Sequence, residues 1–374
     1  MLANTPPMGW NSWNTFGGNI SESLVKETAE AMVDLGFRQA GYEYVVIDDC
    51  WSKLQRSDDG RLVADDQKFP NGIKSLSDFI HTKGLKFGMY SCAGLMTCAA
   101  YPGSYEHEFV DAQTFADWGV DYLKYDYCYK PEHADGNILY HRMGMALRST
   151  GRDILFSACN WGQNTTREWI RSSGAHIYRS TGDITDNFAS FRDIALSQMD
   201  YLGSSSNGCF NDMDMLVVGM YGEGNVGLGG CSDAEYRSHF ALWCLFNSPL
   251  MIGCDIRNLN EESRKLLQNK DLIAINQDPE ARPPRLITAH GDNRMVFFRL
   301  LADGEYAFAF FNFNDTDSVI TCLFPDLGLP VNSGYVFQMT DAFTGETFQT
   351  GRECFAPMVG RHDCKVYRAR LVRK

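Results

Sequence analysis

The 374-residue sequence lacks the features of a membrane protein and of a nucleic-acid-binding protein. Residues 1–11 contain no basic start followed by an apolar core, and the longest apolar run, residues 241–254, includes Asn247 and Pro249 and is too short to span a bilayer. The formal net charge of −13 disfavours nucleic acid and anionic membrane as partners. We therefore expect a cytoplasmic protein, or a secreted one if a signal peptide has been trimmed, with a neutral small-molecule ligand.

The sequence also lacks cysteine pairs with the spacing of a metal site. Its 12 cysteines are scattered along a long chain, which predicts neither a disulfide scaffold nor a zinc site. Most are expected to be buried free thiols, which favours a reducing compartment. None of the eight histidines lies in the strand-end motifs described below, so we expect no metal and no cofactor.

What the chain does contain is a repeated pattern of helix, glycine and strand. Apolar helix faces end at Gly36, Gly84, Gly119, Gly151 and Gly174, and each is followed by a short apolar run typical of a strand buried on both faces. Together with an opening strand near Met8, this gives eight strands over about 280 residues and predicts an α/β fold, a (β/α)8 TIM barrel. The later strands are expected within residues 44–47, 85–90, 120–128, 154–161, 178–183, 210–216 and 249–255.

The composition changes near residue 280. The Pro283–Pro284 pair ends the helical rhythm, and residues 295–301, 306–313 and 318–324 have the pattern of strands separated by Gly, Asp and Asn turns. We expect a catalytic barrel over residues 1–280 and, over residues 283–374, a C-terminal antiparallel β-sandwich domain with an accessory role.

Polar residues gather at the predicted carboxyl ends of the barrel strands, where such barrels build active sites. Lys124 and Asp126 lie two residues apart on one strand and so point to the same side, where the ammonium favours an ionised carboxylate. We interpret Asp126 as a catalytic nucleophile, although a buried ion pair with a purely structural role would give the same pattern. The full set of strand-end residues is Asp48, Asp49, Tyr90, Lys124, Asp126, Asn160, Arg179, Asp183 and Asp214.

A site with several carboxylates, two cations and aromatic residues suits a sugar better than a metal. Sugars need directional partners for their hydroxyls and an aromatic face for their C–H surface, which Trp13, Trp51, Tyr90 and Trp161 could supply. Glycoside hydrolysis needs two carboxyl groups, for which Asp126 and Asp183 qualify. In a retaining enzyme these would lie roughly 5–5.5 Å apart. Mutual repulsion among the acids is expected to raise the pKa of at least one of them.

Seven sequence motifs resemble those of a known enzyme family. MGWNSW, IDDCW, GMYS, LKYDYC, CNWG, RSTGD and NDMDML occur in the same order as in glycoside hydrolase family 27, the α-galactosidase (melibiase) family, which the chain resembles along essentially its whole length. The resemblance implies an exo-acting retaining hydrolase of terminal α-linked galactose, with Asp126 as nucleophile and Asp183 as general acid/base.

The same matching implies the substrate contacts. Asp48 and Asp49 would hold the sugar's O4 and O6, Lys124 its O3/O4 edge, and Arg179 and Asp214 its O2 side. The expected substrate-binding set is completed by Trp13, Tyr90, Cys98, Cys128, Asn160 and Trp161.

The sequence departs from the family pattern at several cysteines. The expected partners of Cys50 and Cys159 are replaced, and Cys98 and Cys128 alone retain both members of a family disulfide. Met213 also stands where the family's NDPDM motif has proline, next to the retained Asp214.

The sequence leaves alternatives for the identity of the sugar and for the presence of catalysis. The paired Asp48 and Asp49 suit a sugar with a C6 hydroxymethyl group, and Trp161 would crowd a 2-acetamido group. Both observations favour galactose over the substrates of the family's β-L-arabinopyranosidases and α-N-acetylgalactosaminidases. A non-catalytic galactose-binding barrel and a metal-dependent enzyme are two further hypotheses, and a homo-oligomer is compatible with the sequence.

Overall fold

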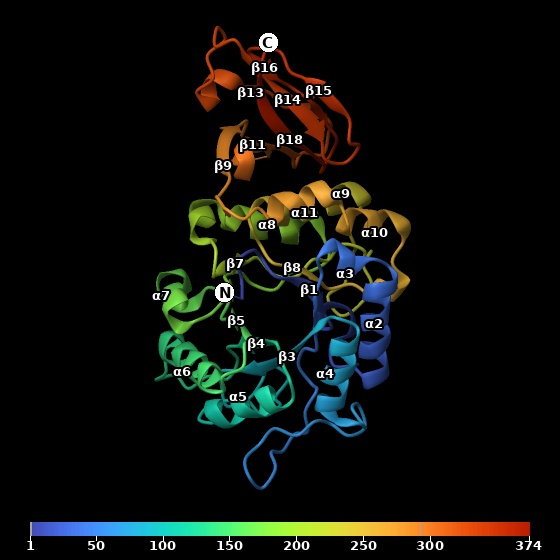
Figure 1. The fold of residues 1–374 in the computed structure, drawn as a ribbon, viewed down its shortest axis with the longest axis vertical. Coiled ribbons are helices and arrows are strands. Elements are labelled where there is room, and N and C mark those ends of the chain that lie inside the picture. The colour runs from blue at the N-terminus through green and yellow to red at the C-terminus, as the bar shows by residue number, and fades with distance from the viewer. Residues whose placement is uncertain (1, 292) are drawn as a thin grey trace.

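The computed structural model describes residues 2–291 and 293–374, which form a barrel with a β-domain stacked on one side (Figure 1). In the barrel, each of the eight strands is followed by at least one helix. This alternation confirms the predicted TIM barrel, and the antiparallel β-domain confirms the second part of the fold prediction. No described helix is long and apolar enough to cross a membrane.

The eight barrel strands are parallel and run in the order β7-β6-β5-β4-β3-β2-β1-β8. The two ends of this sheet are joined by a parallel bridge between Leu216, just after β7, and Ile252 of β8. The strands are β1 (Met8–Asn11), β2 (Tyr44–Val46), β3 (Lys86–Cys92), β4 (Tyr122–Asp126), β5 (Leu155–Cys159), β6 (Ile177–Arg179), β7 (Phe210–Asp212) and β8 (Leu250–Ile252).

Helices surround these strands, and several of them begin at side-chain caps. The Ser21 side chain accepts from Leu24 N at the start of α2, and Ser232 and Glu235 form a capping box at the start of α9. The helices are α1 (Trp13–Phe16), α2 (Glu22–Asp34), α3 (Phe37–Ala40), α4 (Gly72–Thr82), α5 (Glu108–Asp117), α6 (Gly136–Ser149), α7 (Thr166–Ser173), α8 (Phe188–Ser197), α9 (Asp233–Leu245), α10 (Glu261–Leu267) and α11 (Lys270–Asn276).

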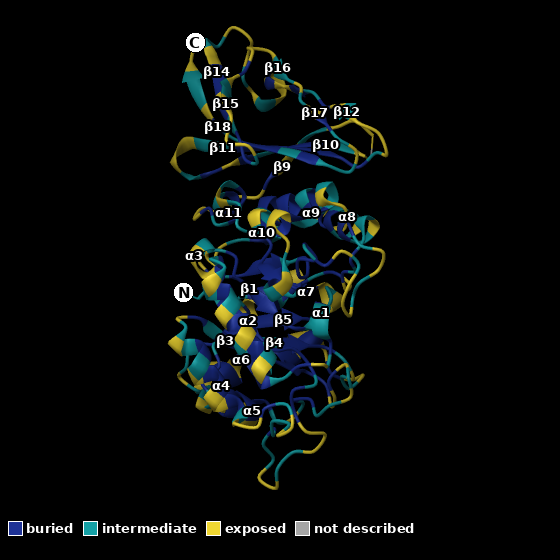
Figure 2. Ribbon diagram, turned by 90° about the vertical axis from the view of Figure 1, so that its right-hand side faces the viewer, coloured by how far each residue is buried: buried dark blue, intermediate teal, exposed yellow. Residues whose placement is uncertain are grey.

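Side-chain alternation along the strands divides the barrel core in two. One cluster combines Tyr44, Tyr122, Leu155, Ile177 and Phe210, one from each of five strands, and a second, larger cluster packs the strands against the helices. The barrel strands are accordingly mostly dark blue in Figure 2. Apolar side chains thus occupy the earlier strand positions, and polar side chains follow at the carboxyl ends.

The C-terminal domain is a two-layer β-structure. Its main antiparallel sheet has the order β15-β14-β18-β11-β10-β9. Ile320, Cys322, Phe324 and Val359, which lie in or next to two small two-stranded sheets, form one apolar cluster with residues of that main sheet. The main strands are β9 (Arg285–Ala289), β10 (Arg294–Leu300), β11 (Glu305–Asn312), β14 (Tyr335–Asp341), β15 (Thr347–Gln349) and β18 (Cys364–Arg373); the small pairs are β12 (Ser318–Val319) with β17 (Met358–Val359) and β13 (Cys322–Leu323) with β16 (Cys354–Phe355).

One expected strand is divided in the structure. Residues 318–324 form β12 and β13, which belong to different small sheets, and Phe324 begins a 3-10 turn that contains Pro325. Proline lacks an amide hydrogen and has a fixed φ, so it favours the first turn of a helix over the continuation of a paired strand.

Helix α9 lies between the barrel and the β-domain (Figure 1). Its Arg237 forms an ion pair with Asp363 at 2.7 Å, and its Ser238 hydroxyl donates to the carbonyl of His362. From the β-domain side, the buried Arg299 donates to the carbonyl of Leu245 at the end of α9. These contacts fix the β-domain against the barrel.

Candidate active site

A cavity of about 80 Å³ opens among residues at the carboxyl ends of the barrel strands and in the loops that follow them. This volume is well below the roughly 300–1,000 Å³ of drug-sized ligand sites, so a small polar ligand fits inside and a larger one must extend through the mouth. Its lining includes most of the site residues expected from the sequence, namely Trp13, Asp48, Asp49, Tyr90, Cys98, Lys124, Asp126, Trp161, Arg179, Asp183 and Asp214.

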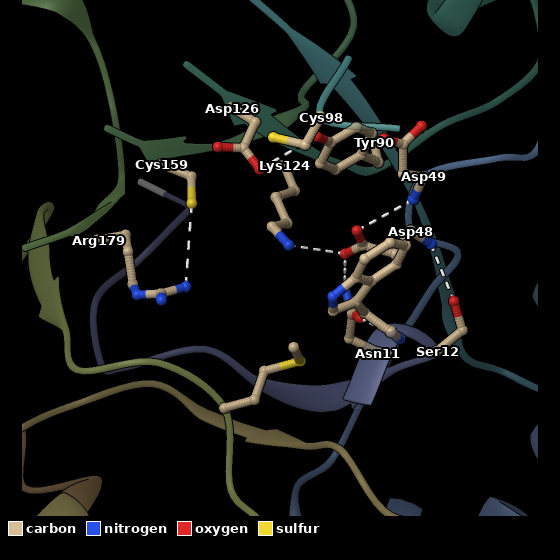
Figure 3. Close-up of polar contacts among 12 residues, drawn as sticks. Asn11, Ser12, Asp48, Asp49, Tyr90, Cys98, Lys124, Asp126, Cys159 and Arg179 are labelled. Atoms are coloured by element: carbon tan, nitrogen blue, oxygen red, sulfur yellow. Dashed lines mark hydrogen bonds and ion pairs between the residues drawn. The ribbon is translucent and has the colours of Figure 1, made fainter. Parts of the chain in front are cut away.

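Asp48 and Asp49 follow strand β2 and have almost no exposed surface. Lys124 Nζ donates to Asp48 Oδ2 at 2.8 Å, and the main-chain N–H of Asp49 donates to Asp48 Oδ1 at 3.0 Å (Figure 3). Asp49 accepts from the main-chain N–H groups of Cys50 and Ala99. Each carboxylate oxygen has about two lone-pair sites, so this pair keeps acceptor capacity for ligand hydroxyls.

Asp126 is the last residue of β4 and is 6% exposed. Its Oδ1 accepts from the main-chain N–H of Tyr127 at 2.9 Å, and its Oδ2 accepts from the Tyr90 hydroxyl at 3.1 Å. Two donors on different oxygens fix the direction of this carboxylate. Lys124 acts on it as a nearby charge, because the ammonium is bonded to Asp48.

Arg179, the last residue of β6, joins the two acids on the other side of the cavity. Its Nη2 lies 2.7 Å from Asp183 Oδ1 and 2.8 Å from Asp214 Oδ2. Asp214 is buried and has a positive φ of 83°, which its side chain helps to hold by accepting from the main-chain N–H of Met215. Asp183, in the loop after β6, is 77% exposed.

Burial dominates the electrostatics of these acids. It raises the pKa of Asp126 to about 6 against the opposing charge of Lys124, and the pKa of Asp214 to about 6 against the opposing charge of Arg179. Burial also raises the pKa of Asp49, with a smaller contribution from the neighbouring Asp48. The expected upward shift is therefore present, but loss of hydration contributes more to it than repulsion between carboxylates. For Lys124, burial is the largest single effect and acts downwards, but the nearby acidic groups, Asp48 first among them, together outweigh it, so the pKa of Lys124 lies well above the usual value.

Aromatic side chains line parts of the cavity. Trp13, Tyr90 and Trp161 are in the lining, and Lys124 Nζ lies 5.2 Å from the centre of the Tyr90 ring. Trp161, two residues beyond the end of β5, has a positive φ of 54°. Trp51, the fourth aromatic candidate, is instead buried outside the lining, where its indole N–H donates to the carbonyl of Tyr90 and its ring packs edge-on against Trp118.

Cys98 and Cys128 form a disulfide that ties the loop after β3 to the loop after β4. Cys98 lines the cavity, whereas Cys128 is outside the lining. Both sulfurs lie close to Asp126, but a disulfide offers no thiolate to a metal ion, so this cluster retains one potential ligand, the carboxylate. In the described part of the chain, the other ten cysteines are free.

Asn160 is also outside the cavity lining. Its side-chain N–H donates to the carbonyl of Gln163, and its Oδ1 accepts from the Thr166 hydroxyl, so it organises the loop between β5 and α7. The residue that does reach the cavity from the end of β5 is Cys159, whose sulfur lies 4.0 Å from Arg179 Nη1.

The lining contains five residues that were not expected as site residues. Cys159 could have been found from strand alternation, because it pairs in register with Arg179. The other four lie beyond the strand ends, where loop conformation decides what faces the cavity; they are Asn14, Ile184, Met215 and Val226.

Comparisons with known proteins identify the family. A family model described as alpha galactosidase A matches residues 5–278, and one described as alpha galactosidase C-terminal beta sandwich domain matches residues 291–369. Alpha-galactosidase 2 of Arabidopsis thaliana is 41% identical over 98% of this chain and 89% of its own length.

Solved structures give the same result. Alpha-galactosidase I of Mortierella vinacea has a TM-score of 0.92 and 34% identity, covering 98% of this chain and 97% of its own. The Saccharomyces cerevisiae α-galactosidase solved with raffinose has a TM-score of 0.88 and 29% identity, covering 99% and 98%. The chain therefore belongs to the α-galactosidase (melibiase) family, family 27 of the glycoside hydrolases, and is a glycoside hydrolase.

Proposed function

We propose that the protein is an exo-acting, retaining α-galactosidase that releases terminal α-linked D-galactose, with Asp126 as nucleophile and Asp183 as general acid/base. The observation that carries the proposal is the contrast between two carboxylates lining one cavity. Asp126 is buried and held by two donors, whereas Asp183 is 77% exposed and held through one oxygen by Arg179.

These environments suit different chemical tasks. A nucleophile must be aimed at one carbon atom and must be ionised, and the two hydrogen bonds on Asp126 hold its direction while its pKa of about 6 leaves it charged at neutral pH. A general acid/base must meet a leaving group and then a water molecule, both of which exchange with solvent. The exposed carboxyl of Asp183 meets that need.

The reaction then runs in two displacements. Asp126 attacks the anomeric carbon while Asp183 gives its proton to the departing glycosidic oxygen, which forms a β-galactosyl ester on Asp126. Asp183, now a carboxylate, takes a proton from water as that water attacks the same carbon. Release of α-galactose returns Asp126 as a carboxylate and Asp183 as an acid, so the proton balance closes.

Recognition of galactose would come from the remaining lining. Asp48 and Asp49 would accept from O4 and O6, and Lys124 would donate to the O3/O4 edge. Arg179 and Asp214 would face O2. Trp13, Tyr90 and Trp161 would pack against the ring, and the rest of the substrate would lie outside this small cavity.

The natural substrate class would be a galactosyl oligosaccharide. Raffinose is the first candidate to test, because it is the ligand named for the solved S. cerevisiae relative. Raffinose ends in one galactose unit, which the proposed contacts in the cavity would hold while the remaining two units extend through the mouth.

Steady-state hydrolysis of an aryl α-D-galactoside by the wild type and by Asp126→Asn tests the proposal. We expect turnover by the wild type and a fall of several orders of magnitude in the variant, because the amide is isosteric but a poor nucleophile. Asp193→Asn is a matched control, because Asp193 lies on α8 and is 64% exposed, and its variant should retain wild-type kinetics.

A substrate panel tests the sugar. The α-N-acetylgalactosaminide and the β-L-arabinopyranoside should be poorer substrates than the α-galactoside, because Trp161 would crowd an acetamido group and the arabinoside leaves the O6 acceptors unpaired. A higher kcat/KM on either analogue would reassign the substrate within the family. Galactose binding without turnover would instead indicate a non-catalytic barrel.

A further inference from the structure

Asn11, the last residue of β1, is buried next to the site but is not part of the cavity lining. Its Nδ2 donates to Asp48 Oδ2 at 2.7 Å, and its Oδ1 accepts from the main-chain N–H of Trp13 at 2.8 Å. Figure 3 shows this side chain directed at the Asp48 carboxylate from the end of its strand. Asn11 therefore connects a carboxylate and an aromatic wall of the same cavity.

The orientation of the Asn11 amide follows from its partners. A main-chain N–H can only donate, so the amide atom that faces Trp13 must be the oxygen. An ionised carboxylate can only accept, so the amide atom that faces Asp48 must be the nitrogen. Both partners require the same rotamer, and neither would tolerate the flipped amide.

This arrangement determines which oxygen of Asp48 is free. Oδ2 accepts from both Asn11 and Lys124, which uses its two lone-pair sites. Oδ1 accepts only from the main-chain N–H of Asp49 among the described residues, which leaves one site on that oxygen. The donor from Asn11 thus holds Oδ2 in place and turns Oδ1 to a ligand hydroxyl.

We propose that Asn11 is a positioning residue that fixes Asp48, and through the main chain Trp13, for recognition of the sugar hydroxyl that Asp48 accepts from. The inference rests on the proposed function, in which Asp48 contacts O4 or O6. Asn11 touches no substrate atom in this account. It acts by setting the direction and hydrogen-bond capacity of a carboxylate that does.

The Asn11→Asp variant tests the role of the amide N–H. One oxygen of the introduced carboxylate still accepts from Trp13, but the other faces Asp48 Oδ2, and two carboxylates at that distance coexist only when they share a proton. The titratable groups around Asp48 are Lys124, Asp49, Asp126, the Cys50 thiol and the Tyr90 hydroxyl. These groups are common to the variant and the wild type, so the ratio of their KM values at each pH isolates the effect of the new carboxylate.

The quantity to compare is the KM of Asn11→Asp for an aryl α-galactoside divided by the KM of the wild type. We expect this KM ratio to be near one in acid. It should rise about 10- to 100-fold towards neutral pH, because the shared proton is lost. The ratio of kcat values should change much less, since ground-state recognition is what weakens. Asn11→Ala, which removes the donor without adding a charge, should give a raised KM ratio that does not depend on pH.

Thermal unfolding with and without D-galactose gives a readout that needs no turnover. Galactose should stabilise the wild type throughout and Asn11→Asp mainly in acid. The proposal would be overturned if both variants fold and their KM ratios stay within about twofold of one at every pH. It would also be overturned if the variants lose only kcat and melting temperature. If Asn11→Asp does not fold, Asn11→Ala decides alone. An inactive wild type would refute the proposed function separately, and the galactose shifts would still decide the role of Asn11.

Discussion

Lys124 donates to Asp48 at 2.8 Å and acts on Asp126, two residues further along the same strand, only through space. The sequence suggested a direct pairing of Lys124 with Asp126. In the structure, the ammonium compensates a carboxylate of the proposed recognition set, and burial therefore determines the charge state of the proposed nucleophile. The pKa of Asp126 rises to about 6, within the working range of many enzymes.

Activity should consequently decline in acid. Because Asp126 must be ionised to attack, we expect kcat/KM to fall as the pH drops through about 6. Replacing Lys124 with Met removes the charge that lowers this pKa, so the acidic limb should move to higher pH. The pH profiles of both proteins on an aryl galactoside measure the shift. If the acidic limb of the variant does not move, the ionisation behind that limb belongs to a group other than Asp126.

The same pKa predicts a stability gain in Asp126→Asn. The folded protein holds a proton on Asp126 that the unfolded chain, with a pKa near 3.9, releases earlier. This contribution to stability is fully present below about pH 4 and is lost as the pH rises through about 6. At pH 7 the ionised carboxylate costs on the order of 3 kcal/mol, which the neutral amide avoids.

Urea unfolding at pH 4 and pH 7 checks this linkage. Asp126→Asn should be more stable than the wild type at pH 7 and close to it at pH 4. If the two proteins differ in free energy of unfolding by the same amount at both pH values, ionisation of Asp126 does not cause the difference.

The loss of activity in Asp183→Ala should depend on the leaving group of the substrate. An aryl group with an acidic phenol departs without protonation, whereas a sugar alcohol does not, so we expect a loss of several hundredfold or more on raffinose and a much smaller loss of the first step on an activated aryl galactoside. Pre-steady-state release of the phenol, compared with steady-state hydrolysis of raffinose, separates the two. Equal losses on both substrates would argue against a proton donor at this position.

The Cys98–Cys128 disulfide should stabilise the loops beside Asp49. It closes a segment of 30 residues, for which chain entropy predicts about 3–4 kcal/mol. The loop after β3 also supplies the Ala99 N–H that Asp49 accepts from. A Cys98→Ser/Cys128→Ser double variant should therefore lose melting temperature and show a higher KM for galactosides. Unchanged values of both would show that the loops hold their positions without the bond.

Much of this architecture could be predicted from sequence, and particular residues show why the rest could not. Lys124 and Arg179 lie on strands, where alternation and the rule for barrel active sites specify their direction. Asn160 lies one residue beyond the end of β5 and turns away from the cavity to organise a loop, while Cys159 takes the inward position. Strand periodicity ends where the strand does, so a loop residue's direction depends on contacts that the sequence does not specify locally.

The β-domain shows the same limit. The runs near β10 and β11 were recognisable from their apolar and aromatic residues, but β12 and β13 form part of separate small sheets whose partners, β17 and β16, lie more than 30 residues further along the chain. Pairing at that separation depends on tertiary packing rather than on local propensity.

Asp126 should form the covalent intermediate with galactose. A fluorinated galactosyl fluoride, which slows hydrolysis of the ester more than its formation, should add one fluorogalactosyl group to the wild-type protein. Mass spectrometry of the digested protein should place that group on the peptide containing Asp126, and Asp126→Asn should remain unlabelled. Labelling of a different carboxylate, or turnover with no labelled intermediate, would contradict the account.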